Sequence, residues 1–381
     1  MTPVQTLAGK QIVVAVTGSI AAVEVVKLIH ALRRRGAIVQ PVMSAAATGI
    51  IHPDALTYAS GRETIQRLSG MVEHVQYCGD EGCADLLLIA PCTANTISKI
   101  ATGIDDTTVT TFATTAIGSR KPVLIVPAMH HSMYRHPAIG ENIARMKLWG
   151  VEFVGPRIEE GKAKIADTED IVLRCERTVL QKPLEGQRIL ITSGPCREPV
   201  DDIRVLTTRS SGLMGRALAL QAYRLGAEVT VVHRDMFPCV NNVYVETADE
   251  MRTAVNNLFA SDGADIYISA AAISDLAPLK IKGRIPSGKQ IQLELKPLPK
   301  LLDEVVKKYT PRTVAFKLGR DQEKIADTMI SGGGIDMVLI NAPETMGSEC
   351  GEYVIVTRRE KFAVNGTKEE IAAAIWEKLL Q

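Results

Sequence analysis

Two short apolar segments of this chain each run directly into a turn of small residues, and they lie about one domain length apart. The first reads QIVVAVTGSIAAVEVV at residues 11–26, and the second reads RILITSGPCREPVDD at residues 188–202. A turn of Gly and Ser between a buried strand and a helix points backbone N–H groups at an anion, usually a phosphate. The repeated pattern therefore predicts two separate phosphate-binding sites, one in each half of the chain.

Continuous apolar runs recur in both halves and alternate with segments of helical spacing. The runs are IVVAV (12–16), LLLIA (86–90), VLIVP (123–127), ILIT (189–192), VTVV (229–232), IYISA (266–270) and VLIN (338–341). Runs without polar alternation are typical of strands buried on both faces. Helical spacing at residues 21–36 and 214–228, with a glycine near each end, completes the alternation. We expect an α/β fold of two doubly wound, Rossmann-like domains with mainly parallel sheets.

The length of 381 residues also favours two domains, each large enough for its own core. Residues 175–187 lose the strand pattern, and Pro183 and Gly186 precede its return. We place the boundary at about residue 182, which gives domains of residues 1–182 and 183–381.

Charge and cysteine content narrow the classes of partner. The chain has 44 Lys and Arg against 43 Asp and Glu, so no basic face for nucleic acid is expected and small molecules are the default ligands. Seven cysteines occur without a CxxC pair, which argues against a disulfide framework and a structural zinc site. No apolar run approaches ~18 residues, and the first residues lack a signal-peptide pattern. We therefore expect a cytoplasmic protein without a membrane partner.

The first turn, VTGSIAA at residues 16–22, lacks the GxGxxG pattern of dinucleotide sites, so a mononucleotide fits better. Ser19 could bind a terminal phosphate or simply cap the following helix. Two further polar turns follow strands, one at Ser44 and one at Thr93 and Asn95. Turns that follow parallel strands meet at one crevice of a doubly wound sheet.

The order of VTGSIAA, MSAAAT, a histidine before a strand, APCTANT and PAMHHSMY resembles the family of homo-oligomeric flavin-containing cysteine decarboxylases over residues 8–157. The resemblance implies FMN as the cofactor and His74 as the catalytic residue that acts on the substrate carboxylate and thiol. It also implies that Met129 and Met133 bind substrate. The residues implied to hold the FMN phosphate are Gly18, Ser19, Ser44, Thr93 and Asn95.

Two positions depart from that family's pattern. His130 stands where the family has asparagine, and because imidazole can also donate to a carboxylate we keep it as a catalytic candidate. The family's flap cysteine has no counterpart in GPRIEEGKAKIADTED. Lys162, Lys164 or another cysteine could replace it as the proton donor, and solvated loop charge is the other interpretation of the two lysines.

In the second half, a long polar insert separates the turn SGP from a second turn, RSSG, that opens the next helix. Ser210, Ser211 and Gly212 at this helix start suit a phosphate or an oxyanion, although a single serine cap would need only one of them. Together with ISAAAISDLAPLKIK, TVAFKLGR and DMVLINAPETMG, this segment resembles the phosphopantothenate–cysteine ligases over residues 187–357.

The second resemblance implies that residues 210–212 bind substrate and that a further set contacts the nucleotide. That set is Ser269, Ala270, Ala271, Asp275, Lys280, Phe316, Lys317 and Asn341. Lys280 is implied to act catalytically beside the triphosphate, with Asp275 as a ligand of Mg²⁺, because both cations stabilise the charge of the reacting phosphate. Thr208 replaces the family's asparagine and is a further catalytic candidate. CTP is the expected cosubstrate, while AFKLG is closer to the eukaryotic ligases and keeps ATP open.

Both resemblances, in this order, indicate an archaeal-like member of the bifunctional phosphopantothenoylcysteine decarboxylase and phosphopantothenate–cysteine ligase family of coenzyme A biosynthesis. They imply ligation of 4′-phosphopantothenate to cysteine through an acyl-nucleotide, followed by FMN-dependent decarboxylation to 4′-phosphopantetheine. They also imply a homo-oligomer, with trimers of decarboxylase domains linked by dimers of ligase domains. Two alternatives stay open. One is another flavin-containing decarboxylase or prenyltransferase-like flavoprotein with a degenerate ligase domain, and the other is a non-catalytic nucleotide-binding regulatory protein.

Overall fold

The chain divides into two units, Met1–Leu180 and Gln181–Gln381. The structure is a computed structural model, and it describes residues 4–159, 162–288, 290–319 and 322–381. In these ranges no helix has both the length and the apolar character needed to cross a membrane. Each unit is described by itself below.

The N-terminal unit is built on a parallel sheet of five strands, in the spatial order β2-β1-β3-β4-β6. The strands are β1 (Gln11–Val16), β2 (Ile38–Met43), β3 (Leu86–Cys92), β4 (Val123–Pro127) and β6 (Glu152–Phe153). The apolar runs of the sequence form the central strands β1, β3 and β4, where nearly every residue is buried. A strand buried on both faces needs helices on both sides.

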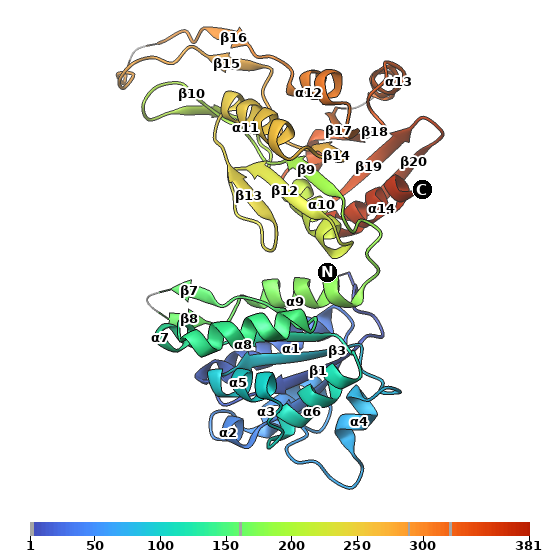
Figure 1. Ribbon diagram of the computed structural model, residues 1–381. Coiled ribbons are helices and arrows are strands. Elements are labelled where there is room, and N and C mark those ends of the chain that lie inside the picture. The colour runs from blue at the N-terminus through green and yellow to red at the C-terminus, as the bar shows by residue number, and fades with distance from the viewer. Residues whose placement is uncertain (1–3, 160–161, 289, 320–321) are drawn as a thin grey trace. The chain divides into compact units, whose positions relative to one another are not determined.

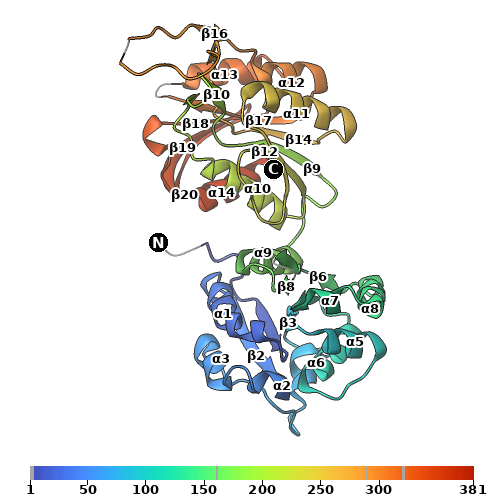
Figure 2. The same ribbon diagram turned by 90° about the vertical axis from the view of Figure 1, so that its left-hand side faces the viewer.

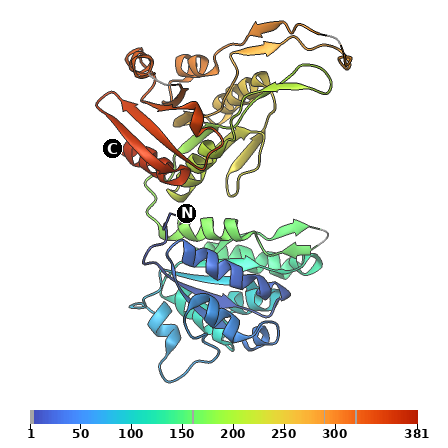
Figure 3. The ribbon, with the colours of Figure 1, turned by 180° about the vertical axis from the view of Figure 1, so that it is seen from behind.

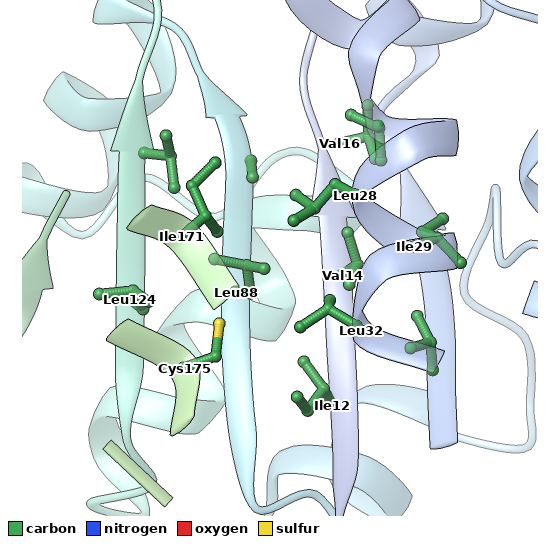
Figure 4. Close-up of a cluster of buried hydrophobic side chains, with 14 of the residues drawn as sticks. Ile12, Val14, Val16, Leu28, Ile29, Leu32, Leu88, Leu124, Ile171 and Cys175 are labelled. Carbon is green, nitrogen blue, oxygen red and sulfur yellow. The ribbon is translucent and has the colours of Figure 1, made fainter. Parts of the chain in front are cut away.

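Two layers of helices cover the two faces of this sheet. One face packs against α1 (Val25–Arg34), α3 (Pro53–Ser60) and α9 (Thr168–Val179). The other packs against α4 (Glu73–Cys78), α5 (Ala94–Thr102), α6 (Thr108–Gly118) and α8 (Pro137–Leu148). Figure 4 shows Val14 of β1 beside Leu28 and Leu32 of α1, in the first of these layers. Because side chains alternate along a strand, Val13 and Ala15 enter the second layer.

Several short elements complete this unit. They are η1 (Ile20–Glu24), α2 (Ala45–Thr48) and α7 (His131–Tyr134), with a small antiparallel sheet of β5 (Met129–His130), β8 (Lys162–Lys164) and β7 (Arg157–Glu159), in that order. The segment that corresponds to the family's flap thus contains β7 and β8, and β8 pairs with β5, the strand that directly follows β4.

The C-terminal unit contains a sheet of eight strands in the order β13-β12-β9-β14-β17-β18-β19-β20. Its strands are β9 (Arg188–Thr192), β12 (Glu228–His233), β13 (Asn241–Tyr244), β14 (Ile266–Ser269), β17 (Arg312–Leu318), β18 (Met337–Asn341), β19 (Cys350–Thr357) and β20 (Lys361–Thr367). Pairing is parallel from β13 to β18 and antiparallel from β18 to β20. The expectation of two doubly wound, mainly parallel α/β units is confirmed.

Helices cover both faces of this sheet as well (Figure 2). One face carries α11 (Ala248–Ser261), α12 (Leu301–Tyr309) and α13 (Glu323–Ser331), and the other carries α10 (Leu213–Arg224) and α14 (Lys368–Leu380). The indole N–H of Trp376 donates to the carbonyl oxygen of Leu218 at 3.0 Å, which fixes α14 against α10. A short helix, η2 (Pro343–Thr345), follows β18.

Two hairpins extend from this unit. β10 (Arg197–Pro199) pairs with β11 (Val205–Thr207), and β15 (Leu276–Pro278) pairs with β16 (Leu295–Pro297). Figure 3 shows the segment between β15 and β16 projecting away from the sheet of its own unit. We call residues 276–297 the arm.

Candidate functional site

Three turns meet at the carboxyl edge of the N-terminal sheet. Val16 pairs with Met43, which sets the turn after β1 beside Ser44. The Thr17 hydroxyl donates to the carbonyl oxygen of Pro91 at 2.7 Å and accepts from the backbone N–H of Thr93 at 3.1 Å. The structure thus brings the turns that carry Gly18, Ser19, Ser44, Thr93 and Asn95 to one edge.

Features of three residues make this edge suitable for a phosphate. A Cβ atom on Gly18 would lie 2.6 Å from the Cβ atom of Ala46, so the turn after β1 can lie this close to α2 only because Gly18 has no side chain. The hydroxyl of Ser44 is buried and has no hydrogen-bond partner among the described residues. Ser19 caps η1 by position without a side-chain hydrogen bond, so its hydroxyl is also available. The backbone of the turns and these hydroxyls fit the phosphate of a mononucleotide.

A cavity of about 720 Å³ lies beside this edge. Ser19, Met129 and His130 line it, together with Arg157 of the β7–β8 hairpin and Lys164. His130 is exposed, and its Nδ1 lies 2.9 Å from the Ser132 hydroxyl. The cavity therefore joins the turn after β1 to the strand that follows β4.

Some expected residues of the N-terminal unit lie away from this cavity or outside what is described. Met133 is half exposed and does not line the cavity. Lys164 does line the cavity, and its ammonium forms an ion pair with Glu159 at 3.1 Å. The side chain of Lys162 lies outside the described residues. So does Lys289 of the other unit, which the sequence groups with Lys296 and Lys300 in a basic region that could close over a phosphate or simply be solvated.

His74 lies on α4, and Figure 1 shows α4 and α7 at opposite sides of the N-terminal unit. Its Nδ1 is buried and has no partner in the described part of the chain. Its neighbours Met71, Val72 and Val75 are exposed apolar residues, with Met71 64% accessible. A single chain therefore does not place His74 at the cavity that contains His130.

Two buried cysteines of the N-terminal unit, Cys78 and Cys92, are poor candidates for a nucleophile. Burial raises the pKa of the Cys78 thiol to about 12 and also raises the pKa of the Cys92 thiol. A thiol with a raised pKa is a poor nucleophile at neutral pH.

The second cavity, of about 610 Å³, lies at the carboxyl edge of the C-terminal sheet. It is formed at the ends of β14, β17 and β18 and at the start of α10, where a doubly wound sheet usually binds its ligand. The expected residues in its lining are Thr208, Ser210, Ser211, Gly212, Ser269, Ala270, Ala271, Asp275, Phe316, Lys317 and Asn341. Most of the residues expected for this half thus share one cavity.

Close packing holds the two small-residue turns of this unit together. A Cβ atom on Gly215 would lie 2.1 Å from the Ser193 hydroxyl, so a glycine is needed where α10 meets the first turn. Gly212 has a φ of +73°, a conformation that favours glycine. The Thr208 hydroxyl donates to the carbonyl oxygen of Ala272 at 3.2 Å, which anchors the second turn to the residues after β14.

Lys280 lies on the arm and does not line this cavity. Its ammonium forms an ion pair with Asp202 at 2.9 Å, and both side chains are about half exposed. Asp275 and Asp303 are the carboxylates of the lining, and in the described ranges no group of three or more potential metal ligands occurs. One or two carboxylates completed by substrate phosphates form a common Mg²⁺ site, so this lining fits that cation.

Several lining residues were not predicted from the sequence. They are Asp303 in the first turn of α12, Tyr353 of β19 and Lys368 of α14, whereas Lys300 belongs to the basic region already noted in the sequence. In the sequence, TKEEI at 367–371 reads as the first turn of a solvent-facing helix. Only the fold brings that turn to the end of β18.

Comparison with known proteins gives a consistent result for both units. Residues 2–180 match the family described as Flavoprotein, and residues 184–381 match the DNA/pantothenate metabolism flavoprotein C-terminal domain. The coenzyme A biosynthesis bifunctional protein CoaBC of Thermococcus kodakarensis is 45% identical over 386 residues, covering 98% of this chain and 95% of that protein. The CoaBC protein of Methanocaldococcus jannaschii is 36% identical over 390 residues, covering 98% and 94%.

A solved structure is also similar to the second half. It is the crystal structure of the C-terminal domain of a CoaBC protein, which is 29% identical, with a TM-score of 0.44, and covers 52% of this chain and 97% of that chain.

Proposed function

The chain belongs to the CoaBC family of bifunctional coenzyme A biosynthesis proteins, and on that premise we propose how its two cavities divide the work. The C-terminal cavity joins 4′-phosphopantothenate to cysteine, and the N-terminal cavity decarboxylates the product to 4′-phosphopantetheine. The observation that carries this division is that each unit has its own cavity at the carboxyl edge of its sheet. Most of the residues predicted for the C-terminal site line the cavity of that unit, while Ser19, Met129 and His130 line the N-terminal one, beside the turns that carry Gly18, Ser44, Thr93 and Asn95.

The N-terminal cavity is proposed to use FMN. Gly18, Ser19, Ser44, Thr93 and Asn95 would hold its phosphate, as the close approach at Gly18 and the unpartnered Ser44 hydroxyl suggest. When bound, FMN supplies reversible two-electron chemistry at the cysteinyl group. His130, with Met129 beside it, would bind the substrate carboxylate at the cavity, and its ring can donate a hydrogen bond there.

We propose that His74 enters this site from a second copy of the chain. His74 is distant from His130 within one chain, its Nδ1 has no partner in the described residues, and exposed apolar side chains surround it. A homo-oligomer that covers Met71, Val72 and Val75 would bury this apolar surface, and burial of apolar surface drives association. Trimers of the decarboxylase unit, linked by dimers of the ligase unit, are the proposed assembly.

In the C-terminal cavity, a substrate carboxylate oxygen would attack the α-phosphorus of a nucleoside triphosphate and release pyrophosphate. The cysteine amine then attacks the acyl carbon, and the nucleoside monophosphate leaves. Ser210, Ser211 and Gly212 would bind phosphate oxygens with N–H and hydroxyl groups, and Asp275 would hold Mg²⁺. Lys280 would have to leave Asp202 by movement of the arm, and its ammonium would then offset the charge of the triphosphate.

Mass spectrometry of the products tests both half-reactions together. The full-length protein is incubated with 4′-phosphopantothenate, cysteine and either CTP or ATP. We expect CMP or AMP with pyrophosphate, then 4′-phosphopantetheine and CO₂, and the productive nucleotide is identified by the same measurement. Absence of any nucleoside monophosphate with both nucleotides would contradict the ligase assignment. Ligated product that is never decarboxylated, in protein with bound flavin, would contradict the decarboxylase assignment.

A further inference from the structure

Lys368, the first residue of α14, lies buried in the wall of the C-terminal cavity and is 7% exposed. Its ammonium donates to the Tyr353 hydroxyl at 2.8 Å and to the carbonyl oxygen of Thr345 at 3.4 Å. It also lies 4.7 Å from the centre of the Tyr353 ring. An ammonium has three protons, and these are its two acceptors in the described part of the chain. One donor therefore remains for a group inside the cavity.

No carboxylate of the described residues pairs with this ammonium. Burial lowers the pKa of Lys368 from its ordinary value, because the charged form loses its hydration. The first turn of a helix is also the positive end of its dipole, where a cation is disfavoured. A buried cation in this position is costly unless an anion compensates it.

The start of α14 does not depend on the Lys368 side chain. The Thr367 hydroxyl accepts from the N–H of Glu370 at 3.2 Å, and the Glu370 carboxylate accepts from the N–H of Thr367 at 2.7 Å. This capping box satisfies the helix start. Gly351 leaves room for the cation, because a Cβ atom there would lie 3.0 Å from the Lys368 ammonium and 3.1 Å from the Tyr353 ring. Gly351 thus leaves space for Lys368 and Tyr353, and the helix cap is made by Thr367 and Glu370 without either of them.

The same cavity has a separate group of anion-suited donors at the start of α10, formed by Ser210, Ser211 and Gly212. The proposed ligase reaction brings two phosphorylated molecules into it, a nucleoside triphosphate and a phosphorylated acid. We propose that Lys368, supported by Tyr353, binds a phosphate oxygen of one of these two molecules beside the end of β18. This assignment rests on the proposed ligase function and adds a binding residue that none of the sequence motifs contains.

The test is equilibrium binding to the full-length protein, with CTP, ATP and 4′-phosphopantothenate titrated separately. Lys368→Met is expected to weaken binding of either the nucleotide or the phosphorylated acid by about tenfold or more, because a charge-assisted contact is lost. The ligand that loses affinity identifies the source of the phosphate. Lys368→Arg keeps the charge and is expected to retain most of the affinity, and Tyr353→Phe is expected to show a smaller loss. Lys378→Met is the matched control, since Lys378 lies on the same helix and pairs with Glu360 at the surface.

The proposal is overturned if folded Lys368→Met binds both kinds of ligand within about twofold of the wild-type affinity. If Lys368→Met does not fold, Tyr353→Phe decides instead, because it keeps the ring and removes only the hydroxyl; unchanged affinity for every ligand then overturns the proposal. Failure of the ligase function itself looks different. In that case the wild-type protein forms no nucleoside monophosphate, whatever the variants bind.

Discussion

Gly18 is the residue at which the N-terminal turn leaves no room for any side chain. Because the added Cβ atom would lie 2.6 Å from that of Ala46, Gly18→Ala must displace the turn or α2. We expect the ratio of bound flavin to protein in the purified variant to fall at least about fivefold, which corresponds to the usual cost of overpacking. Absorbance near the flavin maximum, measured against protein concentration, checks this.

The control for this change is Gly49→Ala, at the end of α2, the helix that contains Ala46. An added Cβ atom on Gly49 has no neighbour closer than 3.8 Å, and the residue has a φ of −77°. This variant should keep its flavin. Equal flavin content in both variants would contradict the assignment of the phosphate to the Gly18 turn.

His74 is the residue for which a catalytic role and a structural role predict different products. We expect His74→Asn to lower the rate of decarboxylation by about 10²-fold or more, since proton transfer by a positioned side chain contributes that much. Ligation should continue, so phosphopantothenoylcysteine accumulates, and chromatography with mass detection measures it. His52→Asn is a suitable control because His52 is an exposed helix cap and asparagine also caps helices well. Normal formation of 4′-phosphopantetheine by His74→Asn would show that the histidine is not catalytic.

At this scale the sequence predicts residues whose chemistry is carried by a local motif. Ser210 and Ser211 could be predicted because they directly precede a helix, while Asn341, at the end of an apolar run, was implied by the family resemblance. Lys368 could not be predicted. Its partner Tyr353 lies 15 positions away on β19, and the capping box around Lys368 is typical of a solvated helix start. Lys280 was named from its motif, but the motif does not predict its ion pair with Asp202. That ion pair holds the ammonium of Lys280 against the loop between β10 and β11.

Among the elements, the loop between β10 and β11 contacts the arm through two carboxylates, of which that of Asp201 is buried and that of Asp202 is half exposed. Asp201 is buried and accepts hydrogen bonds from the backbone N–H of Ile285 at 3.0 Å, of Ile203 at 2.8 Å and of Arg204 at 2.6 Å. The Arg204 guanidinium also donates to it at 2.6 Å. Together these donors hold the pKa of Asp201 well below its usual range. The arm, which contains Ile285, is therefore tied to the loop that leads to the second small-residue turn.

We expect Asp201→Asn to lower the thermal midpoint of the C-terminal unit by several degrees at pH 7, because an amide NH₂ then faces backbone donors. The folded pKa of Asp201 is depressed, so the stabilisation is present above the unfolded pKa of about 4 and is lost as the pH falls below it. The difference in thermal midpoint between the wild type and the variant should therefore become smaller at acid pH. Calorimetry at pH 7 and at about pH 3 measures this.

The neighbouring change Asp202→Asn is the control. Asp202 also contacts the arm, through Lys280 and through the backbone N–H of Gly283 at 3.1 Å, but it is half exposed and both contacts are solvated. A surface pair of this kind contributes at most about 1 kcal/mol. If Asp201→Asn and Asp202→Asn shift the midpoint equally, the buried carboxylate does not hold the arm.

Elements with continuous apolar runs were predictable, and those with alternating or polar sequence were not. The seven predicted runs all lie in strands of the two main sheets. β20 is an edge strand of its sheet, and it alternates between exposed and half-buried residues, so no continuous run marks it. The strands β7 and β8 are short and highly charged, so their sequence does not indicate strands. They form because β8 pairs with β5 on one side and with β7 on the other.

At the scale of the whole molecule, each unit contains its own sheet, its own core clusters and its own cavity. This organisation could be read from the sequence because strand–helix alternation restarts after residue 187. Contacts between copies of the chain could not be read in the same way, because surface residues such as Met71 and Val75 have no periodicity that distinguishes an interface from a solvated loop. Which copy of the chain supplies His74 to a given flavin site therefore depends on how the chains assemble.

Mixed assemblies test whether His74 acts in the site of another copy. Chains with His74→Asn and chains with Gly18→Ala are each expected to be poor decarboxylases, for different reasons. Co-expressed in equal amounts, they form assemblies in which about a quarter of the sites combine an intact flavin turn with an intact histidine. The co-expressed sample should then regain about that fraction of the wild-type rate, while a mixture of the separately purified variants, assayed before subunits exchange, should not. If His74 serves the flavin site of its own chain, every site contains one of the two changes and co-expression restores nothing.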